Sequence, residues 1–362
     1  MEIGILTFHN ALNQGAVLQA YALQTYIEKR GHKVEFIDFS PRYKYTIKGD
    51  IIGKTPRNTF FKWQNVYNRI KYRTSDFSKV LHVSPYRYKS FKELKENPPI
   101  YDLYICGSDQ VWHFPKDLNP VYLMDFLPDG SKIISYAASM GQHFPPSDKI
   151  EKLKSSLFRF DGLSLREDVA VDYVNQLFSG ERAIFHNIDP TLLILSSEYD
   201  KIMEQVETPE RYIATYILNR MDPQHYDILS EAQRVLNTDI INLRNPTTCI
   251  ILKGKENKIV TPYQWLSYIK NSAVVIAGSF HAVVFALIFH KPFVLIQPQS
   301  LVKEGGNKRV MSLLNPLGLS HHCIYDSSDV ESLLKENIDW DVVDNKILDL
   351  AEESKHYLNK YV

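Results

Sequence analysis

The chain has 362 residues, of which 44% are hydrophobic and 12% aromatic, and its 42 Lys and Arg balance its 42 Asp and Glu. This length and composition are typical of a globular protein with about two domains. Because the formal net charge is zero, wholesale binding to nucleic acid is disfavoured, and we expect no nucleic-acid partner. Composition leaves the oligomeric state open.

The cysteines indicate the redox compartment. Cys106, Cys249 and Cys323 are far apart and show neither CxxC nor Cys/His spacing, which predicts no disulfide framework and no structural zinc site. The chain opens directly on a strand-like run, and no apolar stretch reaches the roughly 18 residues that a membrane helix needs. We therefore expect a cytoplasmic protein without an export signal.

The first half of the chain alternates strand-like and helical patterns. A strand at 2–8 precedes a helical run at 16–27, which Gly31 ends, and a second strand follows at 34–39, as in a βαβ unit. The later elements of this half are strands predicted at 101–106, 132–137 and 162–165 and helices predicted at 148–158 and 167–178.

Residues 41–96 differ from the rest in charge. They carry fourteen Lys and Arg against four Asp and Glu, hence +10, interleaved with Tyr and Phe, so the remainder of the neutral chain carries −10. One interpretation is a solvated helical insertion. The other is a contact with an anionic membrane at its inner face, or with the pyrophosphate of a lipid-linked acceptor, because clustered cations gain about 1 kcal/mol each near anionic lipid.

A second α/β series follows Asp189-Pro190. Its strands are predicted at 212–218, 239–243 and 273–277, with helices after Pro223, at 262–270 and from His281. We predict an α/β protein with a GT-B-like fold, that is, two Rossmann-like domains with a cleft between them. The expected domains are 1–185, on the acceptor side, and 186–340, on the donor side. An amphipathic helix at 341–362 could pack back on the first domain.

The segment 271–297 contains the strongest site signal. Gly278-Ser279-Phe280-His281 joins a buried-type strand to an apolar helix, and the start of a helix offers free N–H groups to a phosphate or carboxylate. His281 could donate a proton or a hydrogen bond to such a ligand. The alternative is a capping serine followed by a packed histidine.

Other strand ends carry weaker signals. Asn13-Gln14-Gly15 is either a polar ligand turn or a simple βα turn. In the Gly107-Ser108-Asp109 turn the carboxylate could accept a proton from a hydroxyl or could cap a helix. Arg166 could clamp an anion or form a surface salt bridge. Gly305-Gly306-Asn307-Lys308-Arg309 is either an anion-binding edge or a solvated loop.

Together these residues resemble the polysaccharide pyruvyl transferase family, whose members form pyruvate ketals on sugars with phosphoenolpyruvate as donor. The resemblance spans most of the chain and rests on Asn13-Gln14-Gly15-Ala16, Gly107-Ser108-Asp109-Gln110-Val111-Trp112, Ser164-Leu165-Arg166-Glu167, Asp189-Pro190-Thr191-Leu192-Leu193 and Ser279-Phe280-His281 with Lys291-Pro292-Phe293. The departures are Ser279, where some members have arginine, Ala277-Gly278 in place of Thr-Asp, and Ala282 in place of glycine.

The resemblance implies that His281 and Asp109 are catalytic and that Arg166 binds the donor. Lys308 or Arg309 would add a further cation. The remaining substrate-binding candidates are Ser279, Phe280, Asn307, Asn13, Gln14, Gly15 and Ser108. Phosphoenolpyruvate would be a co-substrate, with no cofactor and no metal, and the acceptor a saccharide that is free or lipid-linked.

Two other functions remain open at this stage. A GT-B glycosyltransferase with a nucleotide-sugar donor would use the same fold and a cleft histidine. A non-catalytic glycan-binding protein would bind sugar without turnover of either donor.

Overall fold

The computed structural model describes residues 1–40, 80–218, 221–244, 250–303 and 306–362. They form two compact units. The first unit contains Met1–Ala11, Ala16–Ile194 and Leu350–Val362, and the second contains Leu12–Gly15 and Leu195–Asp349. The short segment Leu12–Gly15 therefore groups with residues about 200 positions later.

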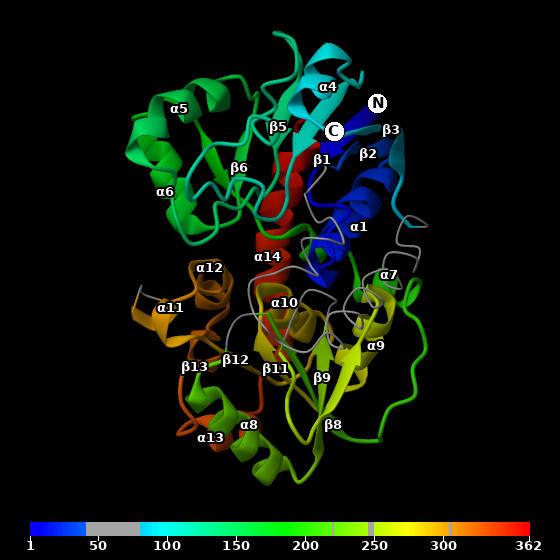
Figure 1. Ribbon diagram of the computed structural model, residues 1–362, viewed down its shortest axis with the longest axis vertical. Coiled ribbons are helices and arrows are strands. Elements are labelled where there is room, and N and C mark those ends of the chain that lie inside the picture. The colour runs from blue at the N-terminus through cyan, green and yellow to red at the C-terminus, as the bar shows by residue number, and fades with distance from the viewer. Residues whose placement is uncertain (41–79, 219–220, 245–249, 304–305) are drawn as a thin grey trace, which may run out of the picture. The chain divides into compact units, whose positions relative to one another are not determined.

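A parallel sheet forms the centre of the first unit (Figure 1). Its strands are β1 (Glu2–Leu6), β2 (Lys33–Phe39), β3 (Val83–Tyr88), β4 (Leu103–Cys106) and β5 (Ile133–Ser135), in the order β3-β2-β1-β4-β5. A parallel pair, β6 (Leu163–Leu165) with β7 (Ile184–His186), continues beside β5 through isolated bridges. The helical elements are α1 (Gln14–Glu28), α4 (Phe91–Glu96), η2 (Ser147–Lys149), α5 (Ile150–Phe158), α6 (Asp168–Leu177) and η3 (Pro190–Leu192).

The second unit repeats this topology with six parallel strands. They are β8 (Tyr212–Ile217), β9 (Asp239–Arg244), β10 (Glu256–Ile259), β11 (Val274–Gly278), β12 (Phe293–Ile296) and β13 (Cys323–Ile324), in the order β10-β9-β8-β11-β12-β13. The helical elements are α7 (Ser196–Asp200), α8 (Pro223–Leu236), α9 (Pro262–Asn271), α10 (Phe280–Ile288), α11 (Gln299–Lys303), α12 (Lys308–Leu317), η4 (Ser320–His322) and α13 (Val330–Lys335).

Alternation along the strands divides the core of the second unit between the two faces of its sheet. Ile213, Ile217 and Ile276 pack in one cluster with Ile228 of α8 and Val330 of α13. On the other face, aromatic rings of α9 and α10 pack edge to face. Because helices cover both faces, the central strands β8, β11 and β12 are fully buried, as in other parallel sheets.

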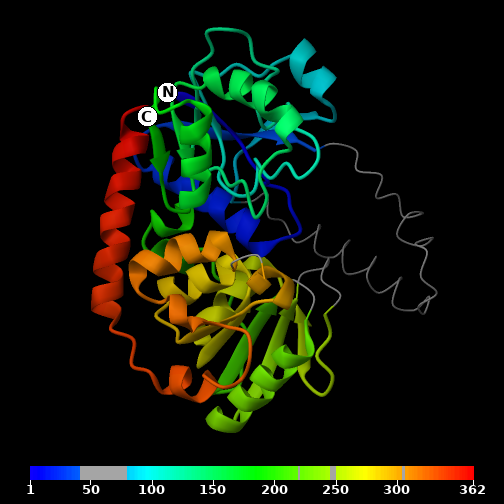
Figure 2. The same cartoon turned by 90° about the vertical axis from the view of Figure 1, so that its left-hand side faces the viewer.

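The last helix, α14 (Trp340–Asn359), is uninterrupted, as Figure 2 shows in red. Its end belongs to the first unit, where the Tyr357 hydroxyl donates to the Ser135 carbonyl at 2.8 Å and the Ser354 hydroxyl accepts from the Ile188 N–H at 3.0 Å. These bonds attach Leu350–Val362 to the edge formed by β5 and β7.

The predicted GT-B-like α/β fold class, with two Rossmann-like sheets, is confirmed by these two sheets. No helix in the described ranges has the length and apolar character to cross a bilayer. Of the basic segment 41–96, only 80–96 lies inside the described residues. The predicted membrane contact of that segment therefore falls largely outside them.

Candidate functional site

In both sheets the strand order reverses direction between the first and the fourth strand along the chain. In the first unit this switch point lies between β1 and β4, and in the second between β8 and β11. Ligands of open α/β sheets bind beyond the carboxyl ends of the strands at such switch points. Each unit therefore offers one carboxyl edge at which a ligand could bind.

In the second unit, the switch point carries the turn between β11 and α10. Ser279 is the N-cap of α10 with an extended backbone, and its hydroxyl accepts a hydrogen bond from the Ala282 N–H at 3.3 Å. Residues 280–287 are all buried, so the helix is held rigidly by packing on every side. The start of α10 therefore presents its dipole and its remaining N–H groups at a fixed position.

His281 lies in the first turn of α10 and is only 8% exposed. The ring of Phe280 meets the imidazole edge to face at 5.1 Å between centroids. A Cβ atom added at Gly15 would lie 2.1 Å from Nδ1 of His281. The backbone of Gly15 therefore touches the imidazole at a distance that no larger residue permits.

The turn that contains Gly15 is itself fixed within the second unit. The Asn13 Oδ1 accepts from the Gly15 N–H at 3.0 Å, as an N-cap does. Gln14 is fully buried: its amide donates to the Val260 carbonyl at 3.0 Å, and its Oε1 accepts from the Tyr216 hydroxyl. Tyr216 lies on β8, next to β11. The Asn13-Gln14-Gly15 turn therefore packs against His281 and forms one side of its site.

A second helix start lies near the end of β12. Gln297 follows β12, and its Oε1 accepts from the Asn307 N–H at 2.6 Å. Nδ1 of His225 accepts from the Asp222 N–H, so Nε2 of the neutral ring carries the proton. Nε2 donates it to the carbonyl of Gln297 at 2.7 Å. Asn307 is the N-cap of α12, is 4% exposed, and its Oδ1 has no hydrogen-bond partner among the described residues.

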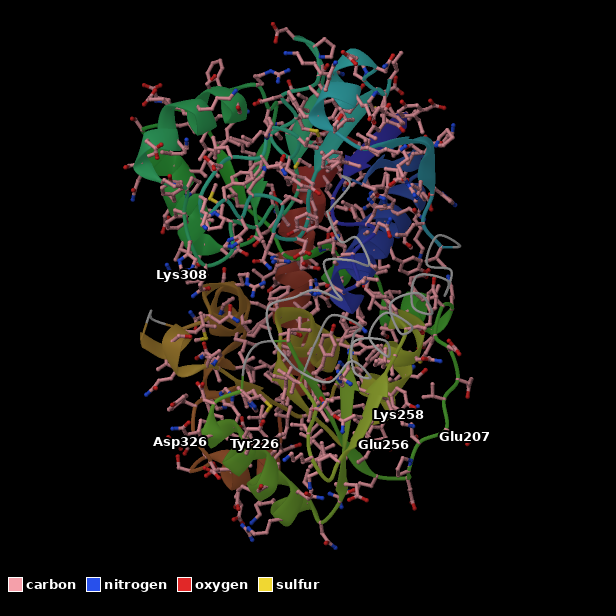
Figure 3. All side chains as sticks on the ribbon, viewed as in Figure 1. Glu207, Tyr226, Glu256, Lys258, Lys308 and Asp326 are labelled. Atoms are coloured by element: carbon pink, nitrogen blue, oxygen red, sulfur yellow. The ribbon has the colours of Figure 1, made fainter. Side chains whose placement is uncertain are left out.

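Two cations open α12. Lys308 and Arg309 are its first residues, and both are partly exposed. Figure 3 labels Lys308. A helix N-terminus with cations in its first turn favours an anionic ligand over a cationic one. Of the predicted anion-binding edge, Gly305 lies outside the described residues.

The carboxyl edge of the first unit, beyond β5, contains a buried arginine. Arg166 follows β6 and is 3% exposed. Its NH1 donates to Asp189 at 2.6 Å and its Nε to Glu167 at 3.3 Å, while NH2 lies 3.9 Å from Oδ1 of Asp109. Burial lowers the pKa of Arg166, but the charges of Asp189, Glu167 and Asp109 outweigh burial and raise it. Arg166 therefore does not form a surface salt bridge but belongs to a buried network of ion pairs.

Asp109 is the exposed member of that network, with 13% of its side chain accessible. Its φ is 65°, and its backbone carbonyl accepts from Ser139 at 2.9 Å. No helix follows Asp109 before β5 in the described chain, so it does not cap one. The hydroxyl of Ser108 is buried and donates to the Ala137 carbonyl at 3.0 Å. Asp109 is thus the carboxylate that a substrate can reach.

The structure groups the sequence candidates into two sets. Ser279, Phe280, His281, Asn307, Lys308, Arg309 and Asn13-Gln14-Gly15 belong to the second unit, whereas Ser108, Asp109 and Arg166 belong to the first. Sequence reasoning assigned Asn13-Gln14-Gly15 to the first domain because the turn follows β1. The clustering of Leu12–Gly15 with the second unit is a long-range property that no local pattern encodes.

Four further polar residues complete these sets. Glu167 and Asp189 hold Arg166, and Tyr216 and Gln297 hold Gln14 and Asn307. Glu167 could have been found from its place beside Arg166. Asp189, which the sequence places just before the second α/β series, accepts the shortest of the hydrogen bonds from Arg166.

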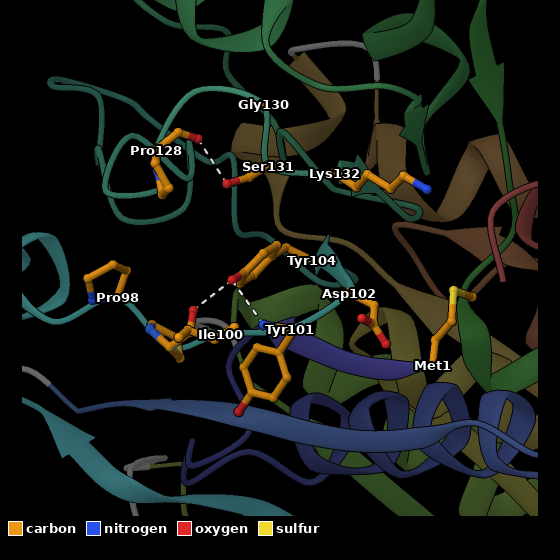
Figure 4. A pocket seen from close by; sticks show the side chains of 11 residues that line it. Met1, Pro98, Ile100, Tyr101, Asp102, Tyr104, Pro128, Gly130, Ser131 and Lys132 are labelled. Carbon is orange, nitrogen blue, oxygen red and sulfur yellow. Dashed lines mark hydrogen bonds between the residues drawn. The ribbon is translucent and has the colours of Figure 1, made fainter.

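A separate pocket of about 760 Å³ opens in the first unit (Figure 4). Met1, Tyr101, Tyr104 and Lys132 are among its lining residues. It lies at the amino ends of β1, β4 and β5, and none of the candidate residues lines it. Because ligands of such sheets bind at the opposite edge, we do not assign the catalytic site to this pocket.

Comparisons with known proteins identify the family. A family model described as polysaccharide pyruvyl transferase matches residues 13–300, which include both the Gly15 turn and His281. No curated protein matches the chain.

Similar solved structures include UDP-N-acetylglucosamine 2-epimerase from Rickettsia bellii, with 13% identity over 100% of this chain and 98% of that one and a TM-score of 0.49. AviGT4, a glycosyltransferase involved in avilamycin A biosynthesis, is 12% identical over 100% and 97% of the two chains, with a TM-score of 0.49. Because the family model covers well over half of the sequence, the chain belongs to the polysaccharide pyruvyl transferase family and is a transferase.

Proposed function

We propose that this protein transfers a pyruvyl group from phosphoenolpyruvate to a saccharide of a polysaccharide precursor, forms a cyclic pyruvate ketal and releases phosphate. The family supports pyruvyl transfer to a saccharide. The observation that carries the proposal is the imidazole of His281, held against Gly15 at the start of α10. A rigid, nearly buried histidine at a helix N-terminus is suited to proton transfer on an anionic substrate.

Donor binding requires compensation of a large negative charge, because phosphoenolpyruvate is a trianion near neutral pH. The starts of α10 and α12 supply N–H groups and positive dipole ends, and Lys308 and Arg309 supply full charges. Charge-assisted hydrogen bonds of this kind are the strongest available to a protein. In this proposal the donor binds in the second unit.

The reaction forms two new C–O bonds and moves two protons from the acceptor hydroxyls, one to C3 of the donor and one to the departing phosphate. An acceptor hydroxyl adds to C2 of phosphoenolpyruvate and loses its proton to a base, while an acid protonates C3 to give a methyl group. The product of this step is a tetrahedral phosphoketal. Cleavage of its C2–O bond releases phosphate, and a second hydroxyl of the same sugar bonds to C2, loses its proton and closes the ketal.

His281 and Asp109 are the proposed acid and base. His281 would protonate C3 or the departing phosphate, and Asp109 would accept a proton from the sugar hydroxyl. Asp109 suits the second role because its side chain is the accessible carboxylate of the Arg166 network. Exchange of the two roles gives the same products, so variants at both positions are needed.

The test measures phosphate release and ketal formation from phosphoenolpyruvate and a saccharide acceptor. His281→Ala and Asp109→Asn should each lower turnover by about 10²–10⁴-fold, the usual contribution of a general acid or base. His290→Ala and Asp129→Asn are matched controls, because both side chains are exposed surface groups. Turnover near that of the wild type in both His281→Ala and Asp109→Asn would contradict the assignment.

Ligand protection from thermal unfolding separates this proposal from a nucleotide-sugar glycosyltransferase. Binding of the donor to the folded state raises Tm, by an amount that grows with ligand concentration over Kd. We expect stabilisation by phosphoenolpyruvate. Stabilisation by a uridine or guanosine diphosphate, with none by phosphoenolpyruvate, would instead favour the glycosyltransferase.

A further inference from the structure

Two histidines and a glutamate meet at a distance from the residues discussed so far. His321 and His322 lie in η4, just before β13, and Glu336 is the C-cap that follows α13. Nε2 of His321 lies 3.1 Å and 3.0 Å from the two carboxylate oxygens of Glu336, and Nε2 of His322 lies 3.4 Å from Oε2. One ligand atom from each of the three residues thus lies within 4.8 Å of the others.

The surroundings of His322 determine which of its ring nitrogens carries a proton. His322 is fully buried, stacks on Phe293 at 4.7 Å between centroids, and places Nδ1 2.8 Å from the Phe293 carbonyl. A carbonyl accepts only, so Nδ1 must donate. In a neutral ring, Nε2 then presents a lone pair and has no proton to give.

That lone pair faces Glu336 without a hydrogen bond. Nε2 of His322 has no hydrogen-bond partner among the described residues, although a carboxylate oxygen lies 3.4 Å away. The lone pair of buried His322 and the carboxylate of partly exposed Glu336 are both electron-rich, so they repel unless a cation lies between them.

The distances match those between ligands of a bound metal ion. Nitrogen and oxygen ligands lie about 2.0–2.2 Å from zinc, so two of them in a tetrahedral site lie roughly 3.3 Å apart. The two nitrogen–oxygen separations, 3.0 Å for His321 and 3.4 Å for His322, agree with this value. A backbone carbonyl that accepts from the far nitrogen of a histidine is also the usual outer partner of a metal ligand, because it fixes the tautomer.

We propose that His321, His322 and Glu336 bind one divalent transition-metal cation of the zinc class. Two imidazoles and one carboxylate favour zinc over calcium or magnesium, which prefer all-oxygen sites. His322 precedes β13 and contacts the first residue of β12, so the site lies at the amino edge of the sheet, whereas His281 follows the carboxyl end of β11. The cation would therefore join η4, α13 and the sheet edge and stabilise the second unit.

The experiment adds zinc chloride to metal-free protein and measures Tm. With zinc in hundredfold excess over its Kd, we expect Tm to rise by about 5 °C or more. His321→Ala and Glu336→Gln should abolish the shift. These two side chains are partly exposed, so the variants are expected to fold. His290→Ala removes another histidine–carboxylate pair of the same unit and should leave the shift unchanged.

A second readout excludes nonspecific binding. Cobalt(II) should bind with a stoichiometry of one and give the visible absorption of a tetrahedral nitrogen–oxygen site in the wild type and in His290→Ala only. An unchanged Tm with zinc in the wild type would overturn the proposal. An equal response in His321→Ala or Glu336→Gln would also overturn it.

Discussion

The first five strands of the two units are ordered alike, but the carboxyl edges of the two sheets carry opposite charge. In the first unit, three carboxylates surround one buried arginine, so the cluster has an excess of negative charge. In the second unit, the corresponding edge combines the starts of α10 and α12 with His281, Lys308 and Arg309. Strand order alone therefore does not decide which ligand a Rossmann-like edge accepts.

The opposite charges assign a different proposed role to each unit. An edge with excess carboxylate repels a trianion but can accept a proton from a hydroxyl, whereas an edge with helix N-termini and cations attracts the trianion. We propose that Arg166 positions Asp109 and that the second unit binds the donor. The direct donor contact implied for Arg166 by the family resemblance stays a prediction, and the variants below separate the two roles.

The largest expected effect follows from removal of the buried arginine. Arg166→Met leaves Asp189, Glu167 and Asp109 without their cation, and loss of one partner of a buried pair costs about 3–5 kcal/mol. Denaturant unfolding should show this loss. Arg87→Met, a control at an exposed arginine that pairs with Asp38, should cost about 1 kcal/mol or less. Wild-type stability with a raised KM for phosphoenolpyruvate would assign Arg166 to donor binding.

A smaller effect tests the contact between Gly15 and His281. Gly15→Ala places a methyl group 2.1 Å from the unshifted Nδ1, so the imidazole must move. A displacement of about 1 Å at a catalytic group costs roughly 10²-fold in turnover. Steady-state kinetics should show this loss in kcat, together with a lower Tm, because the added methyl group also lies 2.6 Å from the Cβ of His281. An unchanged kcat would mean that the position of His281 does not matter.

The smallest stability effect comes from a second carboxylate of the first unit. Burial raises the pKa of Asp38, but hydrogen bonds from His9, Arg87 and Ser40 outweigh burial and lower it to about 2. A depressed folded pKa stabilises the protein above the unfolded value, and this stability is lost as pH falls through about 2. At neutral pH, Asp38→Asn should cost about 1.5–3 kcal/mol.

Chemical denaturation at several pH values measures this cost. The difference between wild type and Asp38→Asn should shrink from pH 4 downward, because protonation of Asp38 removes the advantage of the carboxylate. A difference that stays constant between pH 7 and pH 2 would show that these hydrogen bonds do not depend on the charge. The Arg166 cluster would then need the same pH series.

The sequence predicted those features that local patterns encode. The periodicity of 274–288 indicated a buried strand followed by an apolar helix, and Ser279 indicated its cap; all three are present. The short strands β3 and β7 were missed because they are partly exposed and carry no clear alternation. Polar β10 was missed for the same reason, since an edge strand needs no continuous apolar run.

Contacts between distant segments could not be predicted in this way. The sequence shows Gly15 as a residue of a turn, but nothing local reveals that its missing side chain makes room for His281. Arg166 likewise has Glu167 as a visible neighbour, whereas Asp189 and Asp109 reach it only through the fold. Local patterns thus locate candidate residues, and tertiary contacts decide which of them are already neutralised.

The central claim, that the donor is bound in the second unit, is tested most directly by the affinity for phosphoenolpyruvate. Isothermal titration calorimetry would compare Lys308→Met with Lys258→Met, a matched change at a lysine paired with Glu256 on β10 (Figure 3). We expect Kd to rise about tenfold or more for Lys308→Met, since a charge-assisted contact contributes about 1.5–3 kcal/mol. For Lys258→Met, Kd should stay within about twofold of the wild-type value. Equal affinities in the two variants would contradict the claim.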